Sequence, residues 1–203
     1  MKYYTINTTS KWGDAGSLLI AGIGFREFRH SALLLQRTGP FVPAMSEHSG
    51  LLVVTPNTSD ELKRRWGEEL VQRQVILEKV VLSSWDGTLD DGEEISWEHE
   101  PESIILDEPH SSDIANQIRG ISAFEPVASV RILDFDVDYN ENPSLVRYHG
   151  GVINGSICEI LYPGGFGICC DDTFKEWILQ NPSHSRWLEF SPMIRLSGRV
   201  ARP

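Results

Sequence analysis

Two stretches of the chain repeat one order of hydrophobic and polar positions. In the first stretch, the apolar run 51–54 precedes a short polar segment. Leu62, Trp66 and Leu70 then recur at every fourth position, which is the spacing of one face of a helix. A run rich in β-branched and aliphatic residues follows at 75–82, so this stretch predicts a strand, a helix and a second strand.

The second stretch has the same order. The apolar segment 166–170 predicts a strand, and the acids Asp171 and Asp172 mark the start of a helix. The apolar face of this helix consists of residues at spacings of three and four, namely Phe174, Trp177 and Ile178. The helix ends before Pro182, and the run 187–196 predicts the closing strand.

A carboxylate stands near the start of each of these helices. Asp60 in the first and Asp171 in the second are stabilised there by the positive end of the helix dipole. Leu62 and Phe174 then fall at equivalent places. The shared order has two explanations, an internal duplication or the recurrence of a common strand–helix–strand unit, and the sequence leaves both open.

Weaker patterns fill the rest of the chain. Alternating apolar and polar residues predict three further strands, at 129–139, 147–149 and 157–161. Ser112 is a candidate N-cap for a short helix at 113–119. The pairs Gly150-Gly151 and Gly164-Gly165 are typical of hairpin turns. These elements predict an α+β fold with a mostly antiparallel sheet and short helices.

The length of the chain suits one hydrophobic core. We expect a single globular domain over residues 1–203. The two repeated modules would divide it into subdomains at 1–85 and 120–203, with an acidic insert at 86–113 between them.

The net charge of −11 comes from one stretch of the chain. Residues 80–118 contain eleven acids and no lysine or arginine, whereas the remaining residues carry equal numbers of acids and bases. A concentrated negative field attracts cationic surfaces, accelerates encounter with them and repels nucleic acid. We therefore expect a partner with a cationic surface, and we expect no nucleic acid.

Hydrophobic residues within the acidic stretch favour docking over simple solvation. A purely solvating loop should lack aromatic and aliphatic side chains, but this one contains Trp85, Ile95 and Trp97. A solvated acidic loop remains the alternative interpretation. On the docking interpretation, the candidate binding residues are Asp86, Asp90, Asp91, Glu93, Glu94, Trp97, Glu98, Glu100 and Glu102.

Asp134, Asp136 and Asp138 form the one pattern that resembles a metal site. They alternate with Leu133, Phe135 and Val137, so a strand would place three carboxylates on one face and three apolar groups on the other. The glycine and glutamate of a calcium-binding EF-hand loop are missing. A strand with one solvated acidic face explains the pattern equally simply.

No catalytic motif is present in the sequence. The six histidines are scattered, and the three cysteines, Cys158, Cys169 and Cys170, have no CxxC spacing and predict reduced thiols in strands. We therefore expect no catalytic residue, no cofactor and no bound metal. The N-terminus enters a strand-like pattern without a signal peptide, and no segment has the ~18 apolar residues of a membrane span, so we expect a cytoplasmic protein.

The chain resembles the immunity proteins that are encoded beside bacterial polymorphic toxins. The resemblance begins with Met1-Lys2-Tyr3-Tyr4 and continues through the segment 37–43. It is strongest at 133–190, where an Asp-Phe-Asp-Val-Asp strand precedes Arg147-Tyr148, a glycine-rich turn and the second strand–helix–strand module. About half the chain is covered, in layout more than in specific motifs. The resemblance implies a non-catalytic inhibitor that binds a cognate toxin domain and blocks its active site.

Two other classes of function remain open from the sequence. One is a small metal-dependent enzyme that would use Asp134, Asp136 and Asp138, and the other is a structural or adaptor domain. A metal titration separates the enzyme from the inhibitor, because the inhibitor needs no metal.

Overall fold

A computed structural model of the chain describes residues 1–8, 23–29, 32–38, 44–81, 107–117, 119–141, 143–185 and 188–197. The first half contains β1 (Tyr3–Thr8), β2 (Ile23–Arg29), β3 (Ala32–Thr38), β4 (Met45–His48), β5 (Leu51–Val54), α1 (Pro56–Trp66) and β6 (Leu70–Val81). The second half contains α3 (Ser112–Gln117), β7 (Ser122–Pro126), β8 (Ser129–Asp138), β9 (Leu145–Gly150), β10 (Ile157–Tyr162), β11 (Gly165–Asp171), α4 (Asp172–Leu179), α5 (Pro182–Ser185) and β12 (Leu188–Arg195).

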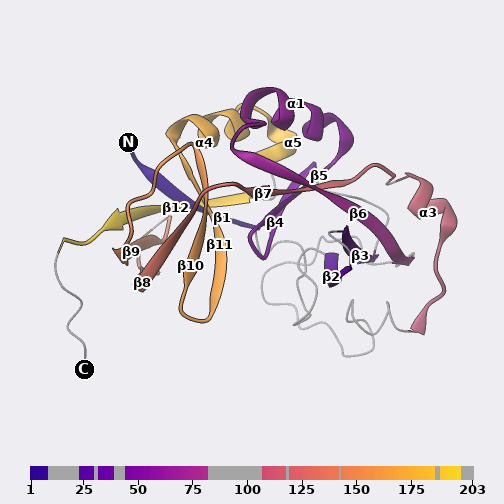
Figure 1. Ribbon diagram of the computed structural model, residues 1–203, viewed down its shortest axis with the longest axis horizontal. Helices are drawn as coiled ribbons and strands as arrows, with labels where there is room; N and C mark the ends of the chain where they lie inside the picture. Colours follow the sequence, from indigo (N-terminus) through magenta and orange to yellow (C-terminus); the bar gives the residue numbers. More distant parts are fainter. Residues whose placement is uncertain are drawn as a thin grey trace.

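The strands form a closed barrel and an open sheet that lie side by side beneath α1, α4 and α5 (Figure 1). The barrel has the order β1-β11-β10-β8-β9-β12, and the six-stranded open sheet has the order β2-β3-β6-β7-β5-β4. Among the described strands, the parallel pairs are β3–β6, β9–β12 and β8–β10, and the other pairs are antiparallel. The expectation of an α+β fold with a mostly antiparallel sheet and short helices is confirmed.

Both halves of the chain contain the same succession of strands and long helix, and they share most strand pairings; the β8–β10 pair, which closes the barrel, has no counterpart between the described residues of β2 and β4. Each half has a first strand, an antiparallel pair (β2–β3 or β8–β9), a tight hairpin (β4–β5 or β10–β11), a helix and a last strand. In each half the last strand pairs in parallel with the third strand, β6 with β3 and β12 with β9. The repeat therefore extends well beyond the two strand–helix–strand modules of the sequence.

The first strand of each half lies in the sheet of the other half. β7 lies between β5 and β6 and is antiparallel to both, while β1 lies between β11 and β12 in the same way. The registers also correspond, since Phe124 of β7 stands opposite Leu52 and Ile6 of β1 stands opposite Ile168. The segments 1–85 and 120–203 thus exchange a strand: β7 joins β5 to β6 in the open sheet, and β1 joins β11 to β12 and closes the barrel.

The helices begin where a capping residue ends the preceding strand. Asp171 is the N-cap of α4, and its carboxylate accepts a hydrogen bond from the Phe174 N–H at 2.9 Å. α1 begins at Pro56, earlier than the sequence predicts, because proline suits the first turn of a helix. Counted from the two N-caps, Thr55 and Asp171, Leu62 corresponds to Ile178, one turn away from the equivalence that the sequence indicated.

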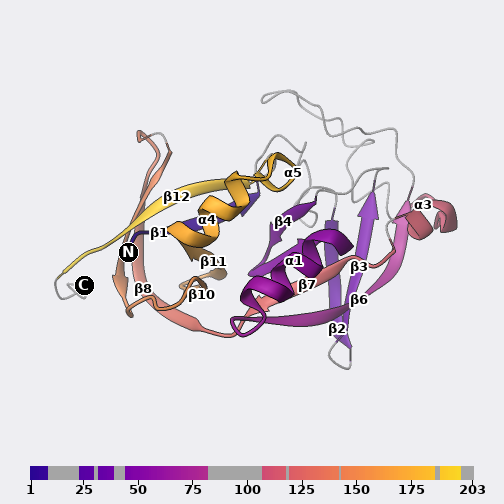
Figure 2. The ribbon, with the colours of Figure 1, turned by 90° about the horizontal axis from the view of Figure 1, so that it is seen from above.

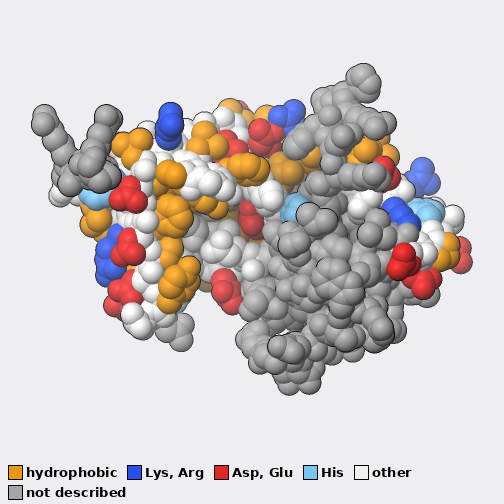
Figure 3. Space-filling model, turned by 90° about the horizontal axis from the view of Figure 1, so that it is seen from below, with side chains coloured by type: hydrophobic (Ala, Val, Ile, Leu, Met, Phe, Trp, Pro, Cys, Tyr) orange, Lys and Arg blue, Asp and Glu red, His pale blue; other side chains and the backbone are white. Residues whose placement is uncertain are grey.

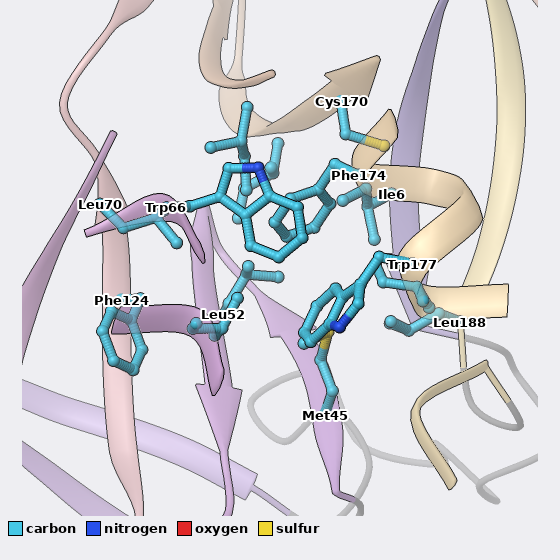
Figure 4. Close-up of a cluster of buried hydrophobic side chains, with 14 of the residues drawn as sticks. Ile6, Met45, Leu52, Trp66, Leu70, Phe124, Cys170, Phe174, Trp177 and Leu188 are labelled. Atoms are coloured by element: carbon cyan, nitrogen blue, oxygen red, sulfur yellow. The ribbon is translucent and has the colours of Figure 1, made fainter. Parts of the chain in front are cut away.

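One hydrophobic core joins the two sheets and the two long helices. Trp66 of α1 packs against two rings of α4, with centroids 4.6 Å from Phe174 and 4.8 Å from Trp177 (Figure 4). From above, α4 lies over the barrel and α1 over the open sheet (Figure 2). The core takes matching residues from both halves, in the pairs Met45 and Ile157, Val54 and Cys170, Leu62 and Ile178, and Leu70 and Leu188.

We predict that a charge placed on either helix at this core unfolds the protein. Leu62 and Phe174 are fully buried, so Leu62→Asp and Phe174→Asp should each lower the free energy of unfolding by about 3 kcal/mol or more. Urea denaturation measures this change. The exposed neighbours provide the control, since Arg64→Asp and Thr173→Asp should cost less than about 1 kcal/mol. Equal losses at buried and exposed positions would contradict the shared core.

Candidate functional site

The acidic residues that the sequence selects for binding lie outside the described residues. They are Asp86, Asp90, Asp91, Glu93, Glu94, Trp97, Glu98, Glu100 and Glu102. Residues 80–81, before this acidic insert, and residues 107–113 at its end are described, however, and they meet at the end of β6. The Val80 N–H donates to Nδ1 of His110 at 3.1 Å, and the Ser111 N–H donates to the Val80 carbonyl at 2.7 Å.

The returning end of the insert is anchored by α3. Ala115 packs against a buried cluster that includes Leu35, Val53 and Val80 of the open sheet. The three described acids of the acidic stretch, Asp107, Glu108 and Asp113, are exposed beside this anchor. The insert is therefore held at its base by backbone hydrogen bonds and apolar packing, which add to the stability of the fold.

Asp134, Asp136 and Asp138 lie at alternate positions of β8, and Asp136 stands opposite Arg147 of β9. The guanidinium lies 3.2 Å from the Asp138 carboxylate and 4.0 Å from that of Asp136. The hydrogen bond from Arg147 lowers the pKa of Asp138, and the Asn140 backbone N–H and side-chain amide also donate to this carboxylate at 3.2 Å. These donors occupy both oxygens of Asp138, and among the described residues no three acidic, histidine or cysteine side chains form a metal-binding group.

A β-bulge changes which β8 side chains share a face. The register shifts between Ile132 and Asp134, so Leu133 is 57% exposed, while Ile132, Phe135 and Val137 line the barrel interior. The expectation that Leu133, Phe135 and Val137 form one apolar face is therefore wrong at its first position. A bulge inserts an extra residue, and simple alternation cannot reveal it.

The three cysteines are free and buried. Cys158 and Cys169 stand opposite each other on β10 and β11 and contribute to the barrel interior, whereas Cys170 packs in the central core. Contact with Cys158 raises the pKa of Cys169, and burial raises that of Cys170. The prediction of free thiols in strands is confirmed.

The barrel contains a cavity of about 430 Å³, which the sequence analysis did not identify. One end of the barrel is filled by a hydrophobic cluster that includes Ile153, Cys158 and Cys169. The cavity occupies the rest of the interior, with polar residues along β1 and β12 and with apolar and aromatic residues along β8 and β10. Its polar wall consists of Thr5, Asn7, Glu189 and Ser191.

The polar wall follows from alternation on two neighbouring strands. On β12, Leu188 and Phe190 pack in the central core, so Glu189 lies on the opposite face of the strand, where it lines the cavity and is exposed. Glu189 stands opposite Asn7 of β1, whose amide donates to the Thr5 hydroxyl at 3.3 Å. The alternation of β1 and β12 is visible in the sequence, but their pairing joins the two ends of the chain and has no local signal.

Glu47 is a buried carboxylate at the junction of the two sheets. Its backbone N–H donates to the Thr8 hydroxyl at 2.9 Å, which joins β4 to β1. Its carboxylate accepts one hydrogen bond, from the Gly50 N–H at 2.8 Å. Burial raises the pKa of Glu47 to about 7 and lowers the pKa of the neighbouring His48 to about 4.

Comparison of the chain with protein-family models, with curated proteins and with solved structures finds no match in any of the three. Within the described part of the chain, the helices are too short and too polar to cross a membrane.

We predict that Glu47→Gln changes how stability depends on pH. In the parent protein, the unfolded state loses the Glu47 proton above a pH of about 4.5, whereas the folded state keeps it up to about pH 7, so the free energy of unfolding falls as the pH rises across this range. His48 has the opposite effect, because the unfolded state takes up its proton below a pH of about 6.5. The variant should therefore gain stability over the parent from pH 5 to pH 8, by roughly 1 to 3 kcal/mol.

Urea denaturation of both proteins across this pH range measures the difference. Glu68→Gln removes an exposed carboxylate and should follow the parent at every pH. A constant difference between Glu47→Gln and the parent at all pH values would show that folding does not raise the pKa of Glu47.

Proposed function

We propose that this protein is a non-catalytic inhibitor of the immunity-protein class, which neutralises a cognate bacterial toxin domain by covering its active site. The observation that carries the proposal is the concentration of eleven acids, without one lysine or arginine, in residues 80–118. The remaining residues are balanced in charge, so the acidic stretch supplies the net charge of −11. A negative field of this kind attracts a cationic partner over long range.

The attachment of the acidic stretch supports this role. Hydrogen bonds between Val80, His110 and Ser111 close its base at the end of β6, on a body stabilised by the exchange of strands. Binding loops act most effectively when a rigid scaffold positions their ends. Trp97 within the stretch is of the residue type that most often anchors a protein–protein interface.

The partner that fits best is an enzyme domain with a cationic substrate cleft. Enzymes that act on phosphate-rich substrates place lysine and arginine where the phosphates bind, and carboxylates of an inhibitor occupy the same positions. We propose Asp90, Asp91, Glu93 and Glu94 as the centre of this contact because they form the densest group of acids.

We predict that charge reversal in the acidic stretch slows association with the toxin. The test partner is the protein encoded by the gene adjacent to that of this chain. Replacing Asp90, Asp91, Glu93 and Glu94 with lysine should lower the association rate constant at low salt by about tenfold or more, because electrostatic steering is lost. Trp97→Ala should act chiefly on the dissociation rate and cost about 2 kcal/mol or more of binding free energy. Stopped-flow or surface-based kinetics at several salt concentrations measures both.

A matched control reverses four exposed acids of the body, Asp60, Glu68, Glu141 and Glu176. This control has the same net charge as the first variant, but its association rate should change much less. Suppose that the reversed acidic stretch binds the toxin and protects cells as well as the parent protein does. The stretch is then only a solvated loop, and the proposal fails.

A further inference from the structure

The cavity of the barrel is lined by a glycine at a position where the other half of the chain has a leucine. Counted back from the N-caps Thr55 and Asp171, Gly167 of β11 corresponds to Leu51 of β5. Leu51 is buried and packs in a cluster with Leu33 and Ala123 on the inner face of the open sheet. In the barrel, no side chain at position 167 occupies the corresponding space.

The backbone at Gly167 does not require a glycine. A Cβ atom at this position would lie 3.7 Å from Ile160 and 3.9 Å from Tyr162, which are ordinary van der Waals contacts. Neither a positive φ nor a steric clash accounts for the glycine, in contrast to Gly150, whose Cβ would lie 2.6 Å from the Arg131 carbonyl oxygen. An empty volume of this size lacks packing contacts, which lowers the stability of the fold unless a ligand fills the cavity.

Charge defines the kind of ligand that the cavity accepts. Among the described residues that line it, Glu189 is the one with a formal charge, and no lysine or arginine accompanies it. Asn7, Thr5 and Ser191 add neutral polar groups to the same wall. A carboxylate at the side of a partly enclosed space favours a cationic group and disfavours an anion.

The opposite wall is hydrophobic and aromatic. The rings of Phe135 and Tyr162 meet edge to face, with centroids 5.1 Å apart, and Val137 and Ile160 lie beside them. Burial raises the pKa of Tyr162, so its hydroxyl stays neutral and donates to the Phe166 carbonyl at 3.3 Å. Aromatic faces attract organic cations and pack well against hydrocarbon groups.

The β10–β11 hairpin points toward the underside of the molecule. This underside, like the cavity, combines acidic and hydrophobic side chains (Figures 1 and 3). Hydrophobic side chains form a band over the barrel half, and acidic side chains lie on both sides of it (Figure 3). Exposed apolar residues of this hairpin and of β8 include Leu161, Phe166 and Leu133.

We propose that the barrel cavity binds an organic ammonium ion, that is, a protonated amine attached to an apolar body. The amine would lie beside Glu189, and the apolar body would contact Phe135 and Tyr162. The volume of about 430 Å³ is within the range of small-molecule sites. Either a free amine or the side chain of a lysine supplies this chemistry. The proposal does not rest on the acidic stretch or on the proposed inhibitory function.

Calorimetric titration of the full chain with 2-phenylethylammonium tests the proposal. Two probes of similar shape serve as ligand controls, the neutral 3-phenylpropan-1-ol and the anionic 3-phenylpropionate. The ammonium should bind at least about tenfold more tightly than either control, because only it forms an ion pair with the Glu189 carboxylate. Equal binding of the anion, or no binding of the ammonium at millimolar concentration, would overturn the proposal.

Three variants locate the site. Gly167→Leu installs the side chain that the other half carries and should abolish binding while the fold is retained. Glu189→Gln should weaken ammonium binding by about tenfold or more and leave binding of the neutral alcohol unchanged. Glu176→Gln removes an exposed carboxylate on α4 and should bind as the parent does. Undiminished binding by a folded Gly167→Leu variant would place the ligand elsewhere and refute the proposal.

A last titration separates the two sources of the ammonium group. Nα-acetyl-lysine-N-methylamide reproduces a lysine side chain on a peptide backbone. If it binds more tightly than 2-phenylethylammonium, the cavity is a lysine-binding site for a protein partner, and the reverse order identifies a site for a free amine. In either case, the Gly167→Leu variant should lose binding of the ammonium. A negative result in the toxin experiment would not change these expectations, because the cavity proposal does not depend on the toxin.

Discussion

The exchange of β1 and β7 is the constraint on which the rest of the structure depends. Each strand fills the gap between two strands of the opposite half that do not pair with each other, β5 and β6 in one case and β11 and β12 in the other. Without it, both flanking strands would lose backbone hydrogen bonds inside the fold. The same exchange brings α1 and α4 together, so that Trp66, Phe174 and Trp177 form one core.

Local patterns account for much of what could be predicted from the sequence. The periodicity around Leu62 and Phe174 reveals two helices that bury these residues, and the order of elements reveals two similar modules. The exchange of strands cannot be predicted from local patterns, because β1 pairs with strands more than 160 residues away. The turn signals misled at Gly150-Gly151, which ends β9 without forming a hairpin, since β9 pairs with β8 and β12.

The two candidate binding features differ in how far the sequence reveals them. The acidic stretch is evident from charge alone, and the structure adds that its base is closed at Val80. The barrel cavity cannot be found from local patterns, because it requires β8 to pair with β10 and β1 with β12. The significance of Gly167 becomes evident only when the repeat is known and the residue is compared with its equivalent, Leu51. The repeated order of strands thus provides an internal comparison, since Leu51 is buried in one half where the other half has Gly167 beside the cavity.

Hydrogen–deuterium exchange with increasing urea tests the exchange of strands most directly. Because each half needs a strand of the other, the most protected amides of β5 and β6 should open with the same free energy as those of β11 and β12. The free energy of opening should also decrease with urea concentration at the same rate in both halves, because one unfolding event exposes the surface of both. An independent half would instead lose protection at a lower urea concentration while the other half stayed protected. That result would contradict the account.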